Sequence, residues 1–275
     1  MTDLANATTF LFVPGDRPDR FAKAVASDAD LVILDLEDAV APDNKGDALH
    51  AVIDALGAAP AGVEAQIRAI VRINTHALYM GLELAALGRL VGQPDHGLLG
   101  IMLPKTEAAD EVEAVSRLLG VPVIPLLETA AGVANANEIA RAEGVSRLAF
   151  GAVDFARDLD ATEPAVFDFA RAQIVIASRA AGLDAPIDSP CVSIDDASVI
   201  SAESHRAAGF GFTGKMCIHP KQIAHVVSGF APTEQQISWA QRVVALDGGA
   251  AQLDGEMIDK PVVDRAKRIL ERGGK

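Results

Sequence analysis

Residues 30–38 read DLVILDLED, in which four consecutive apolar residues lead into a cluster of acids. An apolar run of this length without strict alternation is typical of a parallel strand covered on both faces, and its polar C-terminal end indicates where that strand reaches an open edge. Seven further runs of strand length recur along the chain. They span residues 8–15, 69–74, 99–105, 121–128, 147–154, 185–190 and 211–218.

Longer segments with helical spacing of apolar residues lie between these runs. They predict helices over residues 18–27, 44–56, 76–91, 106–119, 131–143, 163–182, 195–208 and 233–246, with a last amphipathic one over 258–272. Eight alternating strand and helix units predict an α/β fold, a single (β/α)8 TIM barrel over residues 1–230. No further strand is predicted after this point, so residues 231–275 are expected to form a tail of extra C-terminal helices.

Composition excludes several classes of protein. The 275 residues include 24 Lys and Arg against 38 Asp and Glu, a net charge of -14, which argues against binding to nucleic acid or an anionic membrane. No apolar run is long enough for a signal peptide or a membrane span, so we expect a cytoplasmic protein. Cys191 and Cys217 lie far apart in sequence and predict neither a disulfide framework nor a thiolate zinc site.

Charged residues at the predicted strand ends are candidates for a site. Asp35, Glu37 and Asp38 follow the run at 31–34, so a cation should lie near them. Asp38 capping the next turn and Asp35 pairing with a basic residue of the barrel interior are the structural alternatives. Arg72 lies among apolar neighbours and needs a partner, either Glu37 or the carboxylate of a small ligand.

Two further carboxylates end neighbouring runs. Glu128 follows the apolar stretch 121–127, and Asp154 follows 148–153, so both should face one cavity. Two carboxylates without a nearby His or Cys indicate a hard-cation site, for which Mg²⁺ is the natural occupant. A general acid/base pair without metal remains open, whereas scattered histidines without an HExxH motif argue against a zinc hydrolase.

Basic residues suggest two other chemistries. Lys105 and Lys215 lie on predicted barrel runs, where a desolvated amine could form a Schiff base, as in a class I aldolase, or pair with a strand-end carboxylate. Arg17, Arg20 and Lys23 recur at three-residue steps at the start of the first helix. They are candidates for nucleotide phosphates, the alternative being a solvated helix face.

Seven motifs in order resemble the citrate lyase β-subunit-like branch of the HpcH/HpaI aldolase superfamily, the CoA-ester lyases. The resemblance covers about residues 8–230. It is carried by LFVPGDRPDRFAKA, LVILDLEDAVAP, VRIN, LPKTE, PLLETAAG, LAFGAVDFARDLD and GFTGKMCIHPKQI.

The resemblance implies a role for several of these residues. Glu128 and Asp154 would hold Mg²⁺, with Glu128 also at the substrate, and Arg72 would grip the carboxylate of an α-keto acid. Glu37 and Asp38 would orient metal-bound waters, and they are the catalytic candidates together with Arg72. This chain differs from the family at one point: family members often have GAED where residues 151–154 here are GAVD, with valine before Asp154.

The resemblance also implies a reaction and an assembly. The reaction is cleavage or formation of a 3-hydroxy-carboxyacyl-CoA thioester, such as citramalyl-, malyl- or citryl-CoA, from an acyl-CoA and an α-keto acid. Coenzyme A would enter as part of the substrate, with its nucleotide near Arg17, Arg20 and Lys23. The assembly would be a homotrimer or hexamer in which the C-terminal helices pack on a neighbouring subunit. A Schiff-base aldolase on free keto acids, and an acyl-lyase subunit that acts on a carrier protein within a citrate lyase complex, are the alternatives.

Overall fold

The computed structural model describes residues 4–57, 67–246, 251–253 and 255–273. The chain comprises two compact units, Met1–Gly229 and Phe230–Lys275. None of the helices in these described ranges combines the length and the apolar composition needed to cross a bilayer.

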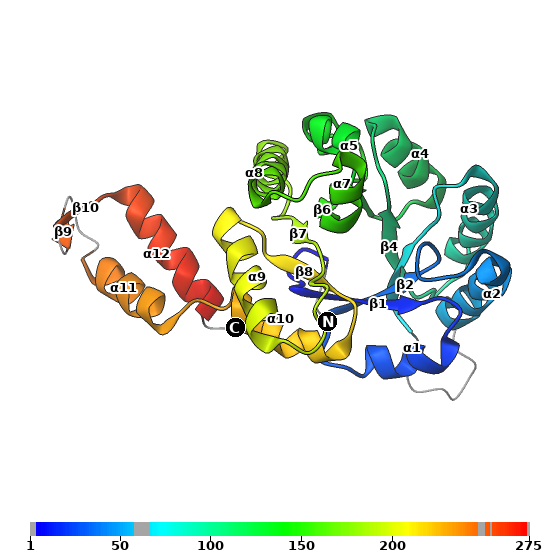
Figure 1. Ribbon diagram of the computed structural model, residues 1–275, viewed down its shortest axis with the longest axis horizontal. Helices are drawn as coiled ribbons and strands as arrows, with labels where there is room; N and C mark the ends of the chain where they lie inside the picture. Colours follow the sequence, from blue (N-terminus) through cyan, green and yellow to red (C-terminus); the bar gives the residue numbers. More distant parts are fainter. Residues whose placement is uncertain (1–3, 58–66, 247–250, 254, 274–275) are drawn as a thin grey trace. The chain divides into compact units, whose positions relative to one another are not determined.

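The larger unit is a closed barrel of eight parallel strands that follow one another in chain order (Figure 1). Each strand overlaps the run predicted for it, so the (β/α)8 prediction is confirmed. The strands are β1 (Thr9–Pro14), β2 (Leu31–Asp35), β3 (Ala69–Arg72), β4 (Leu98–Leu103), β5 (Val123–Leu127), β6 (Ala149–Phe150), β7 (Ile187–Asp188) and β8 (Gly214–Cys217).

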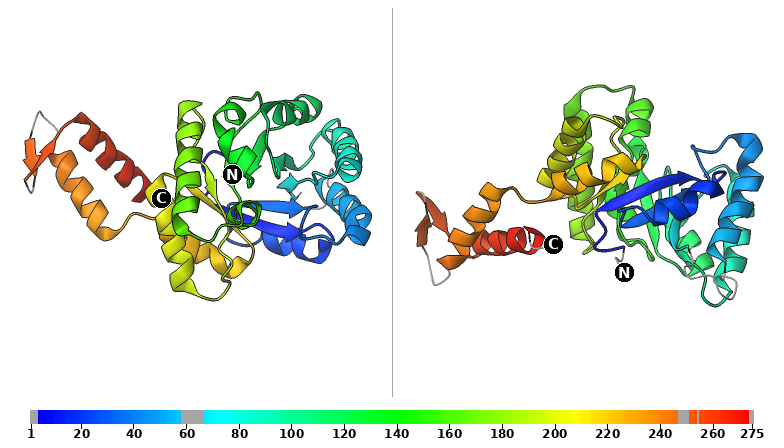
Figure 2. Two further views of the ribbon diagram at one scale, coloured as in Figure 1. Left: turned by 45° about the horizontal axis from the view of Figure 1, so that its top comes forward. Right: turned by 90° about the horizontal axis from the view of Figure 1, so that it is seen from below.

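Helices surround these strands (Figure 2). They are α1 (Pro18–Val25), α2 (Lys45–Leu56), α3 (Ala77–Val91), α4 (Ala109–Leu119), α5 (Ala130–Ala134), α6 (Ala136–Ile139), α7 (Ala152–Leu159), α8 (Pro164–Ala180), α9 (Ala197–Phe210) and α10 (Ile223–Phe230), with short 3₁₀ turns η1 (Pro42–Asn44) and η2 (Pro220–Gln222).

Three sequence predictions for this unit are wrong in detail. The eighth predicted helix, over 233–246, lies in the smaller unit, and the helix that follows β8 is α10, where none was predicted. The helix expected over 131–143 is two short helices, α5 and α6, which meet at Asn135. The strand expected over 147–154 ends at Phe150, because the chain turns at Gly151 and α7 begins at Ala152. The first N–H of α7, on Ala152, donates to Ser189 Oγ at 3.0 Å, a contact between distant residues that no local pattern encodes. Asp154 therefore lies in the first turn of a helix.

The barrel interior is one apolar cluster with members from all eight strands. It contains Phe10, Leu31, Ile33, Ile70, Met102, Ile124, Leu126, Ala149, Ile187 and Met216. Residues two apart on a strand lie on the same face of the sheet. Ile33, Ile70 and Leu126 belong to the interior cluster, so the residues two positions later face the same way. These are Asp35 and Arg72, which end their strands, and Glu128, which directly follows β5. The alternation of the strands thus brings the predicted charged residues to the barrel mouth.

Arg147 closes the opposite end of the barrel. Its side chain is fully buried and donates to the carbonyl oxygens of Leu4 (3.0 Å), Ala7 (2.8 Å) and Ala185 (2.7 Å), and to Thr213 Oγ1 (3.0 Å). Burial lowers the pKa of Arg147 to about 10. This one guanidinium links the segments that precede β1, β6, β7 and β8.

The smaller unit consists of α11 (Glu234–Ala245), the hairpin of β9 (Ala251–Leu253) and β10 (Glu256–Ile258), and α12 (Lys260–Gly273). Thr233 caps α11 by accepting the N–H of Gln236 at 3.2 Å. The hairpin lies in a stretch for which the sequence pattern predicts no strand. The core of this unit is formed by Ala240, Val243, Ile258, Val263, Ala266 and Ile269.

Candidate active site

Arg72 and Asp35 form a paired contact at the barrel mouth. They are register partners on β3 and β2. Arg72 donates from Nε and Nη2 to the two carboxylate oxygens of Asp35 at 2.7 and 2.6 Å, and its guanidinium lies 4.6 Å from the ring centre of Phe12. Asp35 therefore pairs with a basic residue of the barrel interior, as one sequence interpretation held, and that residue is Arg72.

The other end of the Arg72 guanidinium faces Glu37, with 3.2 Å between Nη1 and Oε2. Burial works against the charge on Arg72, but the hydrogen bonds and charge of Asp35, followed by the charges of Glu37 and Glu128, raise its pKa above the ordinary value. Arg72 therefore stays charged. Because Asp35 occupies the edge formed by Nε and Nη2, a ligand carboxylate would meet the guanidinium near Nη1, where it would share the cation with Glu37.

The loop that carries Glu37 and Asp38 is held from two sides. Lys45 Nζ donates to the carbonyl oxygens of Leu36 and Glu37 at 2.7 and 2.6 Å, and the Asn74 amide donates to that of Leu36 at 2.7 Å. Burial raises the pKa of Glu37 against the opposing charge of Arg72, whereas the side chain of Asp38 is 60% exposed. Neither Lys45 nor Asn74 was singled out from the sequence as an anchor of this loop. Asn74 could have been found, because a polar amide directly follows residues 71–73, where β3 ends.

Lys105, just beyond β4, is ion-paired at the mouth. Its Nζ contacts Glu37 Oε1 and lies 3.8 Å from Asp38 Oδ2. Burial alone would lower the pKa of Lys105, but the hydrogen bond and charge of Glu37 raise it above the ordinary lysine value. The amine is held protonated, which opposes the Schiff-base role.

Lys215 lies on the other side of the barrel wall. It precedes the inward Met216 and therefore alternates outward, where Nζ is 2.9 Å from Asp188 Oδ2 and 3.5 Å from Glu203 Oε2. Arg171 of α8 completes the cluster with Nε 2.8 Å from Asp188 Oδ1. Lys215 thus joins strands to helices, and this position also opposes a Schiff-base role.

Glu128 and Asp154 form the candidate metal pair. Glu128 is 2% exposed, and its Oε1 accepts the backbone N–H of Lys105 at 2.9 Å. Burial raises the pKa of Glu128 to about 8, and the neighbouring carboxylates of Asp154 and Glu37 add to the shift. Asp154 lies 3.8 Å from the exposed side chain of Arg157. A buried carboxylate beside like charges is an arrangement that a bound cation would relieve.

The residues present fit a magnesium ion. Within the described ranges, no three or more His, Cys, Asp or Glu side chains are grouped to hold a metal. The candidate donors are the two carboxylates of Glu128 and Asp154. Mg²⁺ commonly takes one or two carboxylates and completes its shell with water or substrate oxygens. Gly151 leaves the space that Glu128 occupies, since a Cβ there would lie 2.5 Å from Glu128 Oε2. The two carboxylates are oxygen donors of the kind that Mg²⁺ takes, and Gly151 gives one of them its space.

The residues of the predicted phosphate cluster lie on α1 and the turn before it. Arg17 donates from Nε and Nη2 to the carboxylate of Asp19, both at 2.9 Å. Arg20 and Lys23 are exposed. The structure therefore places the three cations on the segment that follows β1, with one of them already paired.

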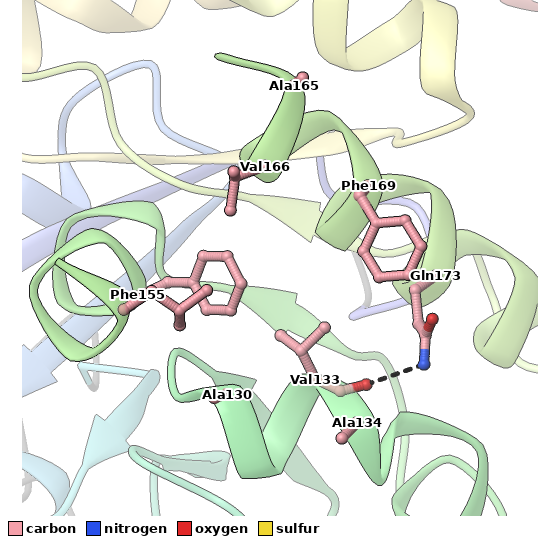
Figure 3. A pocket seen from close by; sticks show the side chains of 9 residues that line it. Ala130, Val133, Ala134, Phe155, Ala165, Val166, Phe169 and Gln173 are labelled. Carbon is pink, nitrogen blue, oxygen red and sulfur yellow. Dashed lines mark hydrogen bonds between the residues drawn. The ribbon is translucent and has the colours of Figure 1, made fainter. Parts of the chain in front are cut away.

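An apolar pocket of about 410 Å³ lies between α5, α7 and α8 (Figure 3). Phe155, next to Asp154 in sequence, forms part of its wall, and Gln173 Nε2 donates to the carbonyl oxygen of Val133 at 3.2 Å. No lining residue is charged, so the pocket does not suit an anionic keto acid. The lining is Ala130, Val133, Ala134, Phe155, Leu159, Ala165, Val166, Phe169 and Gln173.

Comparisons with known proteins place the chain in a family. The model of the HpcH/HpaI aldolase/citrate lyase family matches residues 8–220, so the chain belongs to that family. A citrate lyase subunit beta-like protein of Mycobacterium tuberculosis is 37% identical, over 96% of this chain and 95% of its own length. An L-malyl-CoA/beta-methylmalyl-CoA lyase of Cereibacter sphaeroides is 31% identical, over 95% and 93%.

A solved structure supports the same assignment. Protein CitE of Mycobacterium tuberculosis, in complex with magnesium, acetoacetate and coenzyme A, superimposes with a TM-score of 0.84 at 35% identity, covering 98% of this chain and 99% of that one. The family resemblance read from the sequence motifs is confirmed, and with it the expectation of an enzyme from a family of CoA-ester lyases.

Proposed function

We propose that this chain is a Mg²⁺-dependent carbon–carbon lyase that cleaves or forms a 3-hydroxy-carboxyacyl-CoA thioester, such as citramalyl-, malyl- or citryl-CoA. The products of cleavage are an acyl-CoA and an α-keto acid. The observation that carries the proposal is the buried Glu128 near Asp154, at the same barrel mouth as the charged Arg72. The magnesium, acetoacetate and coenzyme A of the mycobacterial structure are ligands of the same chemical classes.

Glu128 and Asp154 would hold the Mg²⁺. When bound, the ion would act as a Lewis acid toward the substrate oxygens that gain negative charge. The carboxylates themselves contribute position: Glu128 is fixed by burial and by the Lys105 N–H, and Asp154 by its place in the first turn of α7.

Arg72 would bind the carboxylate that becomes part of the keto acid. Its geometry is set in advance, because Asp35 holds the Nε edge and leaves the Nη1 end toward Glu37 and the mouth. A guanidinium held in this way loses little further freedom when a planar carboxylate binds. Arg72 would therefore orient the substrate without rearranging.

Glu37 and Asp38 are the proposed groups for proton transfer. In the cleavage direction the 3-hydroxyl loses its proton, the adjacent carbon–carbon bond breaks, and the acyl-CoA enolate that leaves is protonated at carbon. Glu37 is paired with Arg72 and Lys105, whereas Asp38 is exposed beside Lys105. Either carboxylate can accept the proton, and single substitutions distinguish them.

Residues beyond the mouth complete the proposal. Arg17, Arg20 and Lys23 would bind the phosphates of the CoA nucleotide; a phosphate would have to compete with Asp19 for Arg17. Residues 231–275 would pack on a neighbouring subunit of a homotrimer or hexamer, as the family resemblance implies.

The test is lyase activity of the purified chain on the three thioesters, with and without EDTA. We expect activity that EDTA abolishes and Mg²⁺ restores. Full activity in chelator would contradict the role of the metal. Activity only on an acylated carrier protein would favour a citrate lyase subunit. Trapping of Lys105 or Lys215 by borohydride in the presence of a keto acid would favour a Schiff-base aldolase.

A further inference from the structure

Lys105 has an unusual backbone conformation. Its φ is +49°, in the left-handed region, where the other non-glycine residues of the described chain are Asp95 and Asp160. Aspartate enters this region more readily, because its short polar side chain can bond locally. A lysine has no such compensation, so its conformation is maintained by contacts around it.

The backbone of Lys105 contacts Glu128, one of the two candidate metal ligands. The N–H of Lys105 donates to Glu128 Oε1 at 2.9 Å, from the segment after β4 to the residue after β5. Because Glu128 is almost fully buried, this N–H decides which way one of its oxygens points.

The side chain of Lys105 contacts a different carboxylate, that of Glu37. Lys105 Nζ contacts Glu37 Oε1, on the loop after β2, and the lysine side chain remains 30% exposed. One residue therefore touches both the candidate metal ligand and a candidate proton acceptor, through different atoms.

We propose that Lys105 is a positioning residue whose backbone N–H orients Glu128 and whose ammonium group orients Glu37. What the two carboxylates do rests on the proposed lyase function, whereas the orientation is a statement about geometry alone. The two contributions are separable, because one depends on φ and the other on the side-chain charge.

Four variants separate them. Lys105→Gly accepts positive φ and lacks the ammonium group. Lys105→Val also lacks the ammonium group, but its β-branched side chain disfavours positive φ. Lys105→Arg keeps a cation. Asp95→Gly is the matched control, because it places glycine at another left-handed position, in the segment between α3 and β4.

We expect calorimetry to show Mg²⁺ binding by Lys105→Gly within about threefold of the unaltered chain, and binding by Lys105→Val at least about tenfold weaker. Turnover of the thioester should fall about tenfold in Lys105→Gly and recover to within about threefold in Lys105→Arg. Asp95→Gly should match the unaltered chain in both measurements. Lys105→Thr, which is also β-branched and so also disfavours positive φ, replaces the valine variant if that one does not fold.

Equal Mg²⁺ affinities in the glycine and valine variants would overturn the backbone role, and full turnover in Lys105→Gly would overturn the side-chain role. Crystal structures test positioning without reference to activity: Glu128 should reorient in Lys105→Val, and Glu37 in Lys105→Gly. If neither carboxylate moves, the proposal is wrong even if the chain is a lyase. If both move and the unaltered chain cleaves no thioester, the proposed function alone fails.

Discussion

Gly151 lies directly against Glu128: a Cβ built on this glycine would come within 2.5 Å of Glu128 Oε2 and 2.6 Å of its Cβ. The strand β6 ends one residue earlier, and α7, with Asp154 in its first turn, begins one residue later. The glycine therefore leaves room for one member of the candidate metal pair while it leads the chain to the other. This contact explains in physical terms why the GAVD segment begins with glycine.

Gly151→Ala should weaken the metal site more than the fold. The added methyl group displaces Glu128, so we expect Mg²⁺ affinity to fall at least about tenfold, measured by calorimetry. Overpacking of this kind typically lowers the free energy of unfolding by about 1–3 kcal/mol. The matched control is Gly209→Ala in α9, where a Cβ meets nothing within 4 Å; it should raise stability by about 0.5–1 kcal/mol. Unchanged Mg²⁺ binding in Gly151→Ala would show that Glu128 does not hold the metal.

Arg72 should be needed for both stability and substrate binding, and a double variant separates the two. Arg72→Met alone leaves Asp35 buried and unpaired, so we expect a loss of about 3–5 kcal/mol in the free energy of unfolding. Adding Asp35→Asn removes the orphaned charge and should restore much of that stability. Keto-acid binding should remain lost in the double variant. If calorimetry shows normal keto-acid binding in the double variant, Arg72 is structural only.

The barrel could be predicted because its signal is local. Parallel strands covered on both faces read as short apolar runs, and each run from 8–15 to 211–218 contains most of a strand. The start of α7 could not be read in this way. Its residues continue the apolar run of β6, and its first N–H is satisfied by Ser189, 37 positions further along the chain.

The positions of the candidate site residues were predictable to the same extent. Arg72 and Glu128 could be placed because side chains alternate along a strand. Each lies two positions after a residue of the interior cluster, at the mouth of the barrel. The bond between Arg72 and Asp35 depends on the register of β2 against β3, a property of the closed barrel. The outward direction of Lys215 was available from its place beside Met216, whereas the left-handed backbone of Lys105 leaves no local sequence pattern.

Arg147 should be important for stability alone. Arg147→Met removes the donor to the carbonyl oxygens of Leu4, Ala7 and Ala185, at the end of the barrel opposite the site. A buried group left without its partner costs about 1–3 kcal/mol, so we expect a total loss of at least about 3 kcal/mol. The exposed Arg89→Met should change stability by less than about 0.5 kcal/mol. Urea unfolding measures both, and similar midpoints for the two variants would contradict this role.

Glu83 should make the stability of the barrel depend on pH. Its carboxylate is buried and accepts the backbone N–H of Asn74 at 2.7 Å, and Asn74 in turn holds the carbonyl oxygen of Leu36. Burial raises the pKa of Glu83 above its ordinary value of 4.5, against the opposing bonds from Asn74. The folded chain therefore keeps this proton more tightly than the unfolded chain.

A raised carboxyl pKa contributes stability that is fully present below the unfolded pKa and is lost as pH rises through the folded pKa. Glu83→Gln removes this titration, although its amide cannot accept both Asn74 bonds and adds a constant cost. The difference in unfolding free energy, unaltered chain minus Glu83→Gln, should therefore fall as pH rises above about 4.5 and then level off. Urea unfolding of both proteins across this range measures that difference. A rise with pH would mean that the bonds from Asn74 outweigh burial and that Glu83 is held as the anion.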